Sequence, residues 1–517
     1  MHGSHVKHML IRAGAGLLAA LLCMGLVGAA GCGKKKDGAG AVVNFPVEAA
    51  PRRLDPAVAA SAEELLVVGS CMEGLVRQDA DGKLVPGVAE KWEISGDGRV
   101  LTFHLRGDNR WRLPDKAAGL LGPEGLAGFD AQVTAEDFVF GLGRGLPEGG
   151  FTARAAGRLT LELALERPGG QAFLYALAGE AAMPCRRAYF EACGGRYGLA
   201  PEYLPCNGPF YLDRMGEALT RLKPNEGYRD GAGALPAMVN LWTEPDPYLR
   251  ARLVGADYDA AIVPSEMEEA APEGVTGRAL KNATLALVFN CEALTDVSVR
   301  VALCAALDPE ALGIGQTGLL PGGTQAGGKS YRAAAGLPDG VKYDPARANA
   351  LASSAALANS ATEKIKLRLI CAPEDETLLR RALQGWQRAF RLGLEAEIEA
   401  LEPEELAERM ADGDFDVAVA ELRAERSSAP EALRALEGEG SPARYRSAVL
   451  ETLLAAAAQS GDAARACLQA EEHLLQNGVY YPLRELSGRL LTAQGVEGLQ
   501  VSPVGDRVRF DGVRKWE

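Results

Sequence analysis

The sequence has few of the side chains that most often carry catalysis or bind transition metals. It contains five histidines, and only His104 and His473 lie beyond residue 31. Its ten cysteines include no C-x-x-C pair. A histidine-based metal site or a Ser-His-Asp triad would therefore lack ligands or a base. Neither a Gly-rich phosphate loop nor a nucleophile motif is present, so we expect no enzyme activity, no metal and no cofactor.

Positive charge is also in short supply. The chain has 55 Lys and Arg against 69 Asp and Glu, a formal net charge of −14. Residues 1–31 hold Lys7 and Arg12 and no acid, so the remainder carries −16. Such an acidic body argues against a nucleic-acid-binding protein, which would present a basic face. With 47% apolar residues and a length of 517, the chain is globular and predicts two or three lobes.

The N-terminus has the pattern of an export signal. A basic stretch, residues 2–12, precedes an uncharged apolar run from Ala13 to Gly31. The run ends Ala29-Ala30-Gly31-Cys32, which resembles a bacterial lipobox with Ala29 where Leu is usual. We therefore predict cleavage before Cys32 and a lipid on its thiol. A transmembrane anchor is the alternative, because the 19 apolar residues from 13 to 31 nearly reach the roughly 20 needed to span a bilayer.

Either anchor leaves the body outside the cytoplasmic membrane, which predicts an extracytoplasmic, membrane-anchored protein. Residues 32–41 follow the signal and contain Lys34, Lys35 and Lys36 among glycines and alanines. Such a segment is typical of a flexible tether whose cations suit an anionic bilayer surface.

The stretch from Glu73 to Arg144 has a clear local pattern. Ser95-Gly96-Asp97-Gly98 predicts a turn, after which apolar residues alternate with polar ones from Leu101 to Leu105. Further on, Thr134 predicts a helix cap with Asp137 reaching back to it. These features indicate a hairpin followed by a helix.

This stretch resembles the oligopeptide/dipeptide-binding family of extracytoplasmic solute-binding proteins of ABC transporters. The family signature has the form A-x-x-W-x-x-S-x-D-G, F-x-L-R, W, D-G, T-A-x-D-F, R. Its places are filled here by Ala89, Trp92, Ser95, Asp97, Gly98, Phe103, Leu105, Arg106, Trp111, Asp115, Thr134, Ala135, Asp137, Phe138 and Arg144. The sequence departs from the signature at Lys116, where Gly is usual, and in extra residues between 116 and 132. Leu54-Asp55-Pro56 and Asn207-Gly208-Pro209 resemble further family motifs.

The second half of the chain alternates strands and helices. The predicted order is strand 365–371, helix 376–391, strand 394–398, helix 403–410 and strand 415–422, with Gly393 ending the first helix. This βαβαβ order predicts a parallel sheet with right-handed crossovers. Two further helices are expected to begin at Ser441 and Asp462.

The resemblance implies an α/β fold of two lobes that close about a hinge, the type II periplasmic-binding-protein fold with an extra subdomain in lobe I. The expected divisions are a lipoprotein signal peptide at 1–31, a tether at 32–41, lobe I at 42–280 with a small subdomain near 73–157, lobe II at 281–478, and a return segment at 479–517 that completes lobe I.

In peptide-binding members the ligand's amino group is held by an acid that follows a strand beginning F-D. The corresponding run here starts at Phe415-Asp416 and places Glu425 at the acid's position. Two arginines flank Glu425 and could neutralise it, so a solvated charged loop is the alternative. Arg106, Arg144 and Asp137 are expected to have structural roles.

The cysteines leave one question open. Cys185, Cys193 and Cys206 are near enough in sequence to form a local bridge, while buried free thiols are equally compatible with the pattern.

The expected function is capture of peptides and their delivery to the membrane permease of an ABC importer, with no nucleic-acid partner. Two alternatives remain. The same fold could bind another solute (a nickel chelate, an opine or a sugar), or the protein could present its ligand to a membrane sensor.

Overall fold

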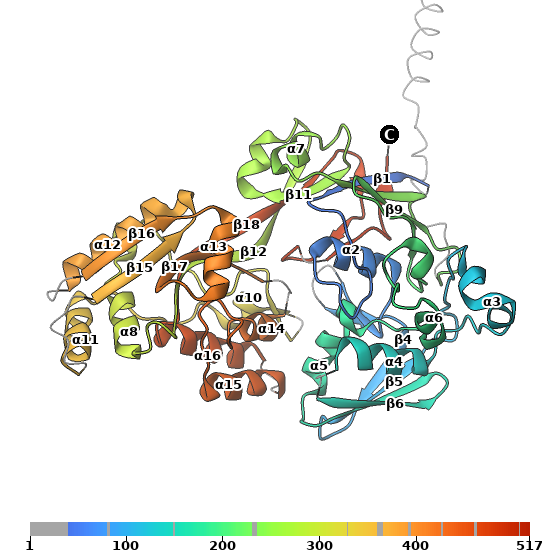
Figure 1. Ribbon diagram of the computed structural model, residues 1–517, viewed down its shortest axis with the longest axis horizontal. Coiled ribbons are helices and arrows are strands. Elements are labelled where there is room, and N and C mark those ends of the chain that lie inside the picture. Colours follow the sequence, from blue (N-terminus) through green and yellow to red (C-terminus); the bar gives the residue numbers. More distant parts are fainter. Residues whose placement is uncertain are drawn as a thin grey trace, which may run out of the picture.

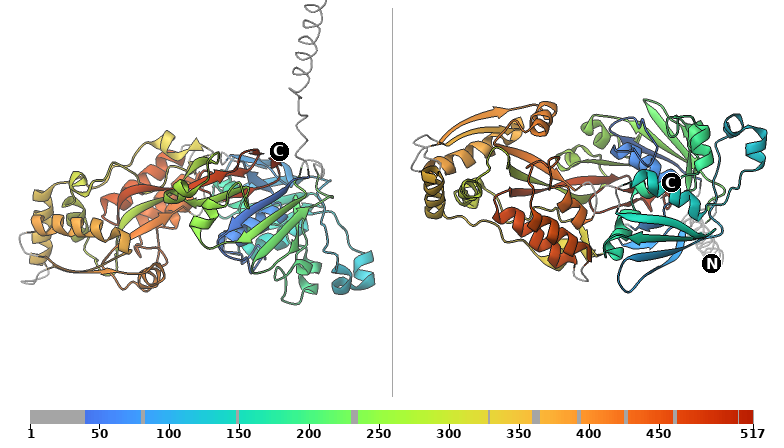
Figure 2. Two further views of the ribbon diagram at one scale, coloured as in Figure 1. Left: turned by 90° about the horizontal axis from the view of Figure 1, so that it is seen from above. Right: turned by 60° about the horizontal axis from the view of Figure 1, so that its bottom comes forward.

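The computed structural model describes residues 40–79, 83–147, 150–229, 235–327, 329–358, 365–390, 394–424, 428–459, 463–505 and 507–516. Two lobes lie side by side, and strands of both the middle and the end of the chain run between them (Figure 1). Seen from above, the red segment near the C-terminus passes from one lobe into the other (Figure 2). No helix among the described residues is long and apolar enough to cross a membrane.

Lobe I is built on two four-stranded sheets. The first has the order β1-β10-β9-β8, and β1 runs parallel to β10. Its strands are β1 (Val42–Val47), β8 (Phe210–Arg214), β9 (Leu219–Pro224) and β10 (Met238–Thr243). Helix α2 (Ala62–Cys71) shares one buried apolar core with this sheet.

Helix α2 begins where the sequence provides a complete cap. The Ser61 hydroxyl accepts a hydrogen bond from the Glu64 amide at 3.2 Å. The Glu64 carboxylate in turn accepts from the amides of Ala60 at 3.0 Å and Arg53 at 2.9 Å. Burial raises the pKa of Glu64, but these backbone hydrogen bonds outweigh it and hold the pKa below its usual range. The charged cap therefore fixes both the helix and the chain that enters it.

The second sheet forms the small subdomain, in the order β4-β5-β7-β6. Its strands are β4 (Ala89–Ile94), β5 (Val100–Leu105), β6 (Phe151–Gly157) and β7 (Thr160–Leu165). The predicted turn at 95–98 joins β4 to β5 and is confirmed. Helix α4 (Ala135–Gly145) covers the sheet and starts with the predicted Thr134–Asp137 capping box, which is also confirmed.

One six-stranded sheet of order β11-β18-β12-β17-β15-β16 extends from the junction of the lobes, at β11, into lobe II, which holds β17, β15 and β16 (Figure 1). Its strands are β11 (Ala260–Pro264), β12 (Thr276–Phe289), β15 (Ile365–Cys371), β16 (Leu394–Ala400), β17 (Val417–Arg423) and β18 (Tyr480–Thr492). Strand β15 pairs in parallel with both β16 and β17, which confirms the predicted βαβαβ unit. Strand β18 lies between β11 and β12 and pairs antiparallel with both.

Helices cover both faces of this sheet. Helices α8 (Val297–Ala305), α11 (Pro345–Ala358) and α12 (Glu376–Ala389) pack on one face around the buried Trp386. Helices α14 (Ala429–Arg434), α15 (Ala448–Gln459) and α16 (Ala463–Gln476) pack on the other. Helix α13 (Pro403–Asp412) joins β16 to β17. The predicted stop at Gly393 and the predicted start at Asp462 lie outside the described residues.

The prediction that a helix begins at Ser441 is wrong. Helix α15 starts at Ala448, seven residues later. Ser441 instead closes a turn, in which its hydroxyl donates to the Gly438 carbonyl at 2.7 Å. Arg444 then adopts a left-handed backbone with φ of 51°, which a continuous α-helix cannot contain. Local turn chemistry therefore replaces the first two turns of the expected helix.

The end of the chain returns to lobe I. Two short hairpins follow β18: β19 (Val496–Glu497) pairs with β22 (Arg514–Lys515), and β20 (Gln500–Val501) pairs with β21 (Val508–Arg509). Val501, Phe510 and Val513 are buried in the lobe I core. The Phe510 ring packs edge-on against that of Phe45 in β1, with 5.5 Å between centroids.

Candidate ligand-binding cleft

The two long strands β12 and β18 are the hinge between the lobes. Their pairing shifts register between Leu280 and Ala283, so Lys281 and Asn282 form a bulge. Both bulge carbonyls accept hydrogen bonds from lobe II: Lys281 from the Gly323 amide at 3.0 Å, and Asn282 from the Ala424 amide at 2.9 Å. Two loops of lobe II are thus attached at one point of the hinge.

The first of these loops also touches lobe I. The Gly322 amide donates to the Glu485 carboxylate of β18 at 2.6 Å, and the same carboxylate pairs with Lys281 at 3.3 Å. At Gly323 a Cβ would lie only 2.8 Å from the Pro503 carbonyl oxygen of the return segment. Only glycine allows this approach, so the loop and the return segment meet at the hinge.

A buried carboxylate on α16 holds the same loop. Glu471 is completely buried and accepts from the amides of Leu319 at 2.6 Å and Leu320 at 3.0 Å. It also accepts from the Tyr331 hydroxyl at 2.6 Å and forms a two-pronged ion pair with Arg332. Burial and the nearby Glu471 charge raise the pKa of Tyr331, so the phenol stays protonated and donates.

The second loop carries the acid predicted from the sequence. Strand β17 ends with Glu421 and Arg423, which form an ion pair at 2.9 Å. On the far side of the loop, Ser428 pairs with Gln325 in a parallel bridge. Glu425 lies outside the described residues, between the anchored positions 424 and 428. Cys32, the predicted lipidation site, also lies outside them.

On the lobe I side, a cavity of about 60 Å³ opens between α2, β2 (Val76–Gln78), the short 3-10 helix Glu180–Ala182 and β21. Apolar side chains such as Leu66 and Met183 line its interior, and Arg77 and Arg507 line it as well. Arg507 donates to the Gln78 side chain and lies 3.7 Å from the Glu180 carboxylate. Figure 1 shows α2 and the return segment on the side of lobe I that faces lobe II.

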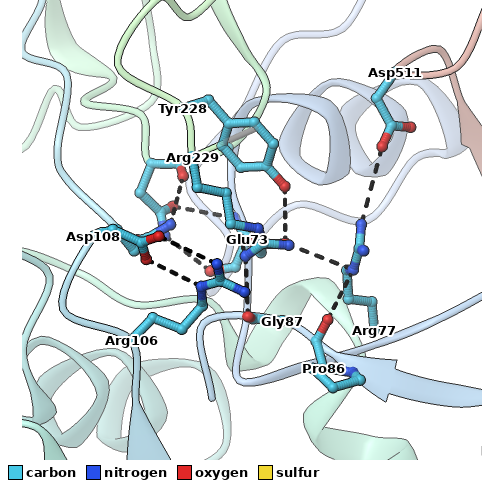
Figure 3. Close-up of polar contacts among 12 residues, drawn as sticks. Glu73, Arg77, Pro86, Gly87, Arg106, Asp108, Tyr228, Arg229 and Asp511 are labelled. Carbon is cyan, nitrogen blue, oxygen red and sulfur yellow. Dashed lines mark hydrogen bonds and ion pairs between the residues drawn. The ribbon is translucent and has the colours of Figure 1, made fainter. Parts of the chain in front are cut away.

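A buried ion-pair network supports this wall (Figure 3). Arg229 donates to both oxygens of Glu73, at 2.5 and 2.7 Å, and both side chains are less than 5% exposed. Arg77 lies between two acids, 3.6 Å from Glu73 and 4.0 Å from Asp511. Asp511 already has a partner, because Arg509 donates to both of its oxygens at 3.1 and 2.6 Å.

The family motifs of lobe I have structural contacts. Arg144 forms an ion pair with Asp55 and stacks over the Phe190 ring at 3.9 Å. Asp137 pairs with Arg186 at 2.8 Å in addition to capping α4. Burial raises the pKa of Asp137, although Arg186 and the cap oppose that effect. Arg106 pairs with Asp108 at 3.0 Å.

Metal ligands and disulfides are not found among the described residues. No group of three or more His, Cys, Asp or Glu side chains there could hold a metal ion. The eight cysteines within the described ranges are free thiols, seven of them buried. Of the two possibilities open for Cys185, Cys193 and Cys206, the structure has the buried thiols.

Comparison with known proteins identifies the family. A family model described as "Bacterial extracellular solute-binding proteins, family 5 Middle" matches residues 83–442, more than half of the chain. The chain belongs to this family.

Curated relatives of this family 5 protein match in segments. The periplasmic oligopeptide-binding protein OppA of Haemophilus influenzae is 38% identical over 99 residues, which span 19% of this chain and 15% of the relative. The dipeptide-binding protein of Escherichia coli is 26% identical over 367 residues, covering 64% of this chain and 66% of the relative. The first of these matches therefore spans less than a sixth of the relative's length.

Solved structures share the fold of the family 5 protein over nearly its whole length. A dipeptide-binding protein from Pseudoalteromonas sp. SM9913, in complex with Met-Leu, has a TM-score of 0.70 at 17% identity and covers 92% of this chain and 100% of that one. Listeria monocytogenes OppA bound to peptide has a TM-score of 0.67 at 18% identity, covering 92% and 99%. The predicted two-lobed α/β class is thereby confirmed.

Sequence reasoning about this family 5 protein missed the residues that hold the loop 319–323 of lobe II at the hinge. Glu471 lies 139 residues from Arg332, and Gly323 lies 180 residues from Pro503. A buried acid among apolar residues of α16, and the Pro321-Gly322-Gly323 run, were the available signals. Neither indicates its partner without the fold.

Proposed function

We propose that the chain is the lipid-anchored, extracytoplasmic peptide-binding component of an ABC importer. The observation that carries the proposal is the hinge: a bulge in β12 at Lys281–Asn282 to which loops of lobe II are attached, beside the return segment of lobe I. Rotation at such a hinge closes two lobes over a ligand. Proteins of the same fold are named for peptide binding, which supports a peptide as the ligand.

The proposal includes the domain division expected from the sequence. Lobe I comprises residues 42–280 and the return segment 479–517, and lobe II comprises residues 281–478. The permease of the importer is the membrane partner, and the cleft between the lobes holds the peptide. Glu425 is proposed to pair with the ligand's amino group.

Peptide binding should stabilise the protein measurably. At a peptide concentration 100 times the dissociation constant, binding to the folded state alone adds about 2.7 kcal/mol to the free energy of unfolding. Thermal unfolding with a library of di- to pentapeptides measures the shift, and small-angle scattering should show a smaller radius of gyration. Sugars, opines and nickel chelates serve as the comparison set. A shift with one of these and none with peptides would assign the alternative solute.

Anchoring is expected to depend on Cys32. We expect the mature protein to begin at this residue with a lipid on its thiol, because the Ala-Ala-Gly that precedes it resembles a lipobox cleavage site. Mass spectrometry of the membrane-extracted protein gives the mass of the N-terminal peptide. An uncleaved leader containing an unmodified Cys32 would contradict the proposal and favour a transmembrane anchor. A Cys32→Ala variant released into the soluble fraction is the matched control.

A further inference from the structure

Three arginines, Arg77, Arg507 and Arg509, line the cavity in the lobe I wall, together with two acids, Glu73 and Glu180. Among the described ion pairs of the network around Glu73, three arginines (Arg77, Arg229 and Arg509) face two carboxylates, those of Glu73 and Asp511. Each carboxylate already holds a two-pronged partner, Arg229 for Glu73 and Arg509 for Asp511. Arg77 is therefore the surplus cation of this network.

Arg77 is also held loosely. Its distances to the two acids are 3.6 and 4.0 Å, and its Nε donates a hydrogen bond to the Pro86 carbonyl at 3.1 Å. The terminal nitrogens of its guanidinium are thus available for a stronger acceptor. A partly buried cation of this kind is stabilised by an anion that supplies hydrogen-bond acceptors.

Arg507 adds a second cation to the same cavity. Its guanidinium donates to the side chain of Gln78, the residue that follows Arg77 in the sequence. The Arg507 side chain is 18% exposed. Its carboxylate partner Glu180 is at 3.7 Å, beyond hydrogen-bond distance. Both guanidinium groups line one cavity of about 60 Å³, a volume that suits a carboxylate group or a small side chain.

The cavity lies next to the point where the lobes meet. Pro503, which approaches Gly323 of lobe II, is four residues before Arg507. Gly505, in the same turn, lies against Leu280 of the hinge. A Cβ at position 505 would be 3.2 Å from the Cδ1 of Leu280. The two arginines therefore belong to the part of lobe I that borders the cleft, and not to a remote surface.

We propose that Arg77 and Arg507 form a subsite for a carboxylate of the ligand, and that this carboxylate is the C-terminus of a bound peptide. The inference rests on the proposed peptide-binding function and specifies it: the favoured ligands have a free C-terminal carboxylate. The apolar lining of Leu66 and Met183 beside the arginines fits an apolar C-terminal side chain.

The test compares three forms of one peptide that binds the wild-type protein, measured by calorimetry: a free C-terminus, a C-terminal amide, and an amide with an internal glutamate. In the wild type we expect amidation to weaken binding about 10-fold to 100-fold, because a charge-assisted hydrogen-bond pair is lost. In Arg507→Gln and Arg77→Gln the free acid and the amide should bind within about threefold of each other. The Arg154→Gln variant, which removes an exposed ion pair with Glu162, should behave like the wild type.

The outcomes separate the inference from the function on which it rests. Peptides that bind equally well as acid and amide would overturn the carboxylate subsite and leave peptide binding intact. Recovery of affinity by the internal glutamate would assign the subsite to a side-chain carboxylate and overturn the C-terminal assignment. If no peptide form binds and another solute does, both proposals fail. An unchanged circular dichroism spectrum and melting point show that a variant is folded. Arg507→Lys keeps the positive charge but lacks the paired donors of a guanidinium. The affinity of this variant for the free acid should fall between those of wild type and Arg507→Gln.

Discussion

Replacing Glu471 with alanine is expected to lower the free energy of unfolding of lobe II by about 3–5 kcal/mol, since the change leaves a largely buried cation without its partner. The Arg332 side chain is 14% exposed and its guanidinium pairs with this completely buried carboxylate. The amides of Leu319 and Leu320 and the Tyr331 hydroxyl lose their acceptor at the same time.

Denaturant unfolding followed by tryptophan fluorescence measures this loss. Trp386 lies in the core of lobe II, and the other four tryptophans lie elsewhere in the sequence, at 92, 111, 242 and 516. Glu404→Ala removes an exposed acid from α13 and should change stability by less than about 0.5 kcal/mol. A loss below about 1 kcal/mol for Glu471→Ala would mean that water satisfies the loop and that the carboxylate does not hold it.

Replacing Glu425 with glutamine is expected to weaken peptide binding by roughly 2–5 kcal/mol, mostly through faster dissociation. A ligand ammonium enclosed between two lobes loses its hydration, and an opposite charge with hydrogen bonds must replace it. The described residues on either side are attached to lobe II and the hinge: the Ala424 amide donates to the Asn282 carbonyl, and Ser428 pairs with Gln325.

Calorimetry with a free and an N-acetylated form of one peptide tests this pairing. The acetylated peptide should bind wild type poorly and be nearly indifferent to Glu425→Gln. If the residue is a solvated loop charge, the substitution should cost under about 1 kcal/mol with either peptide. Equal affinities throughout would direct attention to Glu421. Asp416 is a weaker candidate, since it accepts from the Arg368 amide at 2.6 Å at the opposite end of β17.

Local chemistry made much of the fold predictable. The capping box of Thr134 and Asp137, the turn at 95–98 and the alternation in β5 each depend on residues within a few positions of one another. The parallel unit of β15, β16 and β17 followed from the same kind of periodicity. The helix expected from Ser441 failed for a local reason as well, since the turn at Gly438 and the left-handed Arg444 outweigh the helical pattern.

The cleft was less predictable because its contacts join distant parts of the chain. The pairing of Gly323 with Lys281 and Pro503 depends on a bulge in β12, and a bulge has no reliable mark in a strand's alternation. The surplus cation Arg77 becomes visible only when Asp511, from the last residues of the chain, is placed beside it. Sequence order gives no hint of that neighbourhood.

The return of the chain's end to lobe I has a consequence for the order of folding. The two apolar cores of lobe II draw their buried residues from 285–483, one continuous stretch. The core around β1 needs Val501, Phe510 and Val513 as well as Val43 and Phe45. Lobe I, which is synthesised first, therefore completes its folding last. Its core stays incomplete until almost the whole chain has left the ribosome. A chain that must thread through a translocation channel before folding gains time from this arrangement.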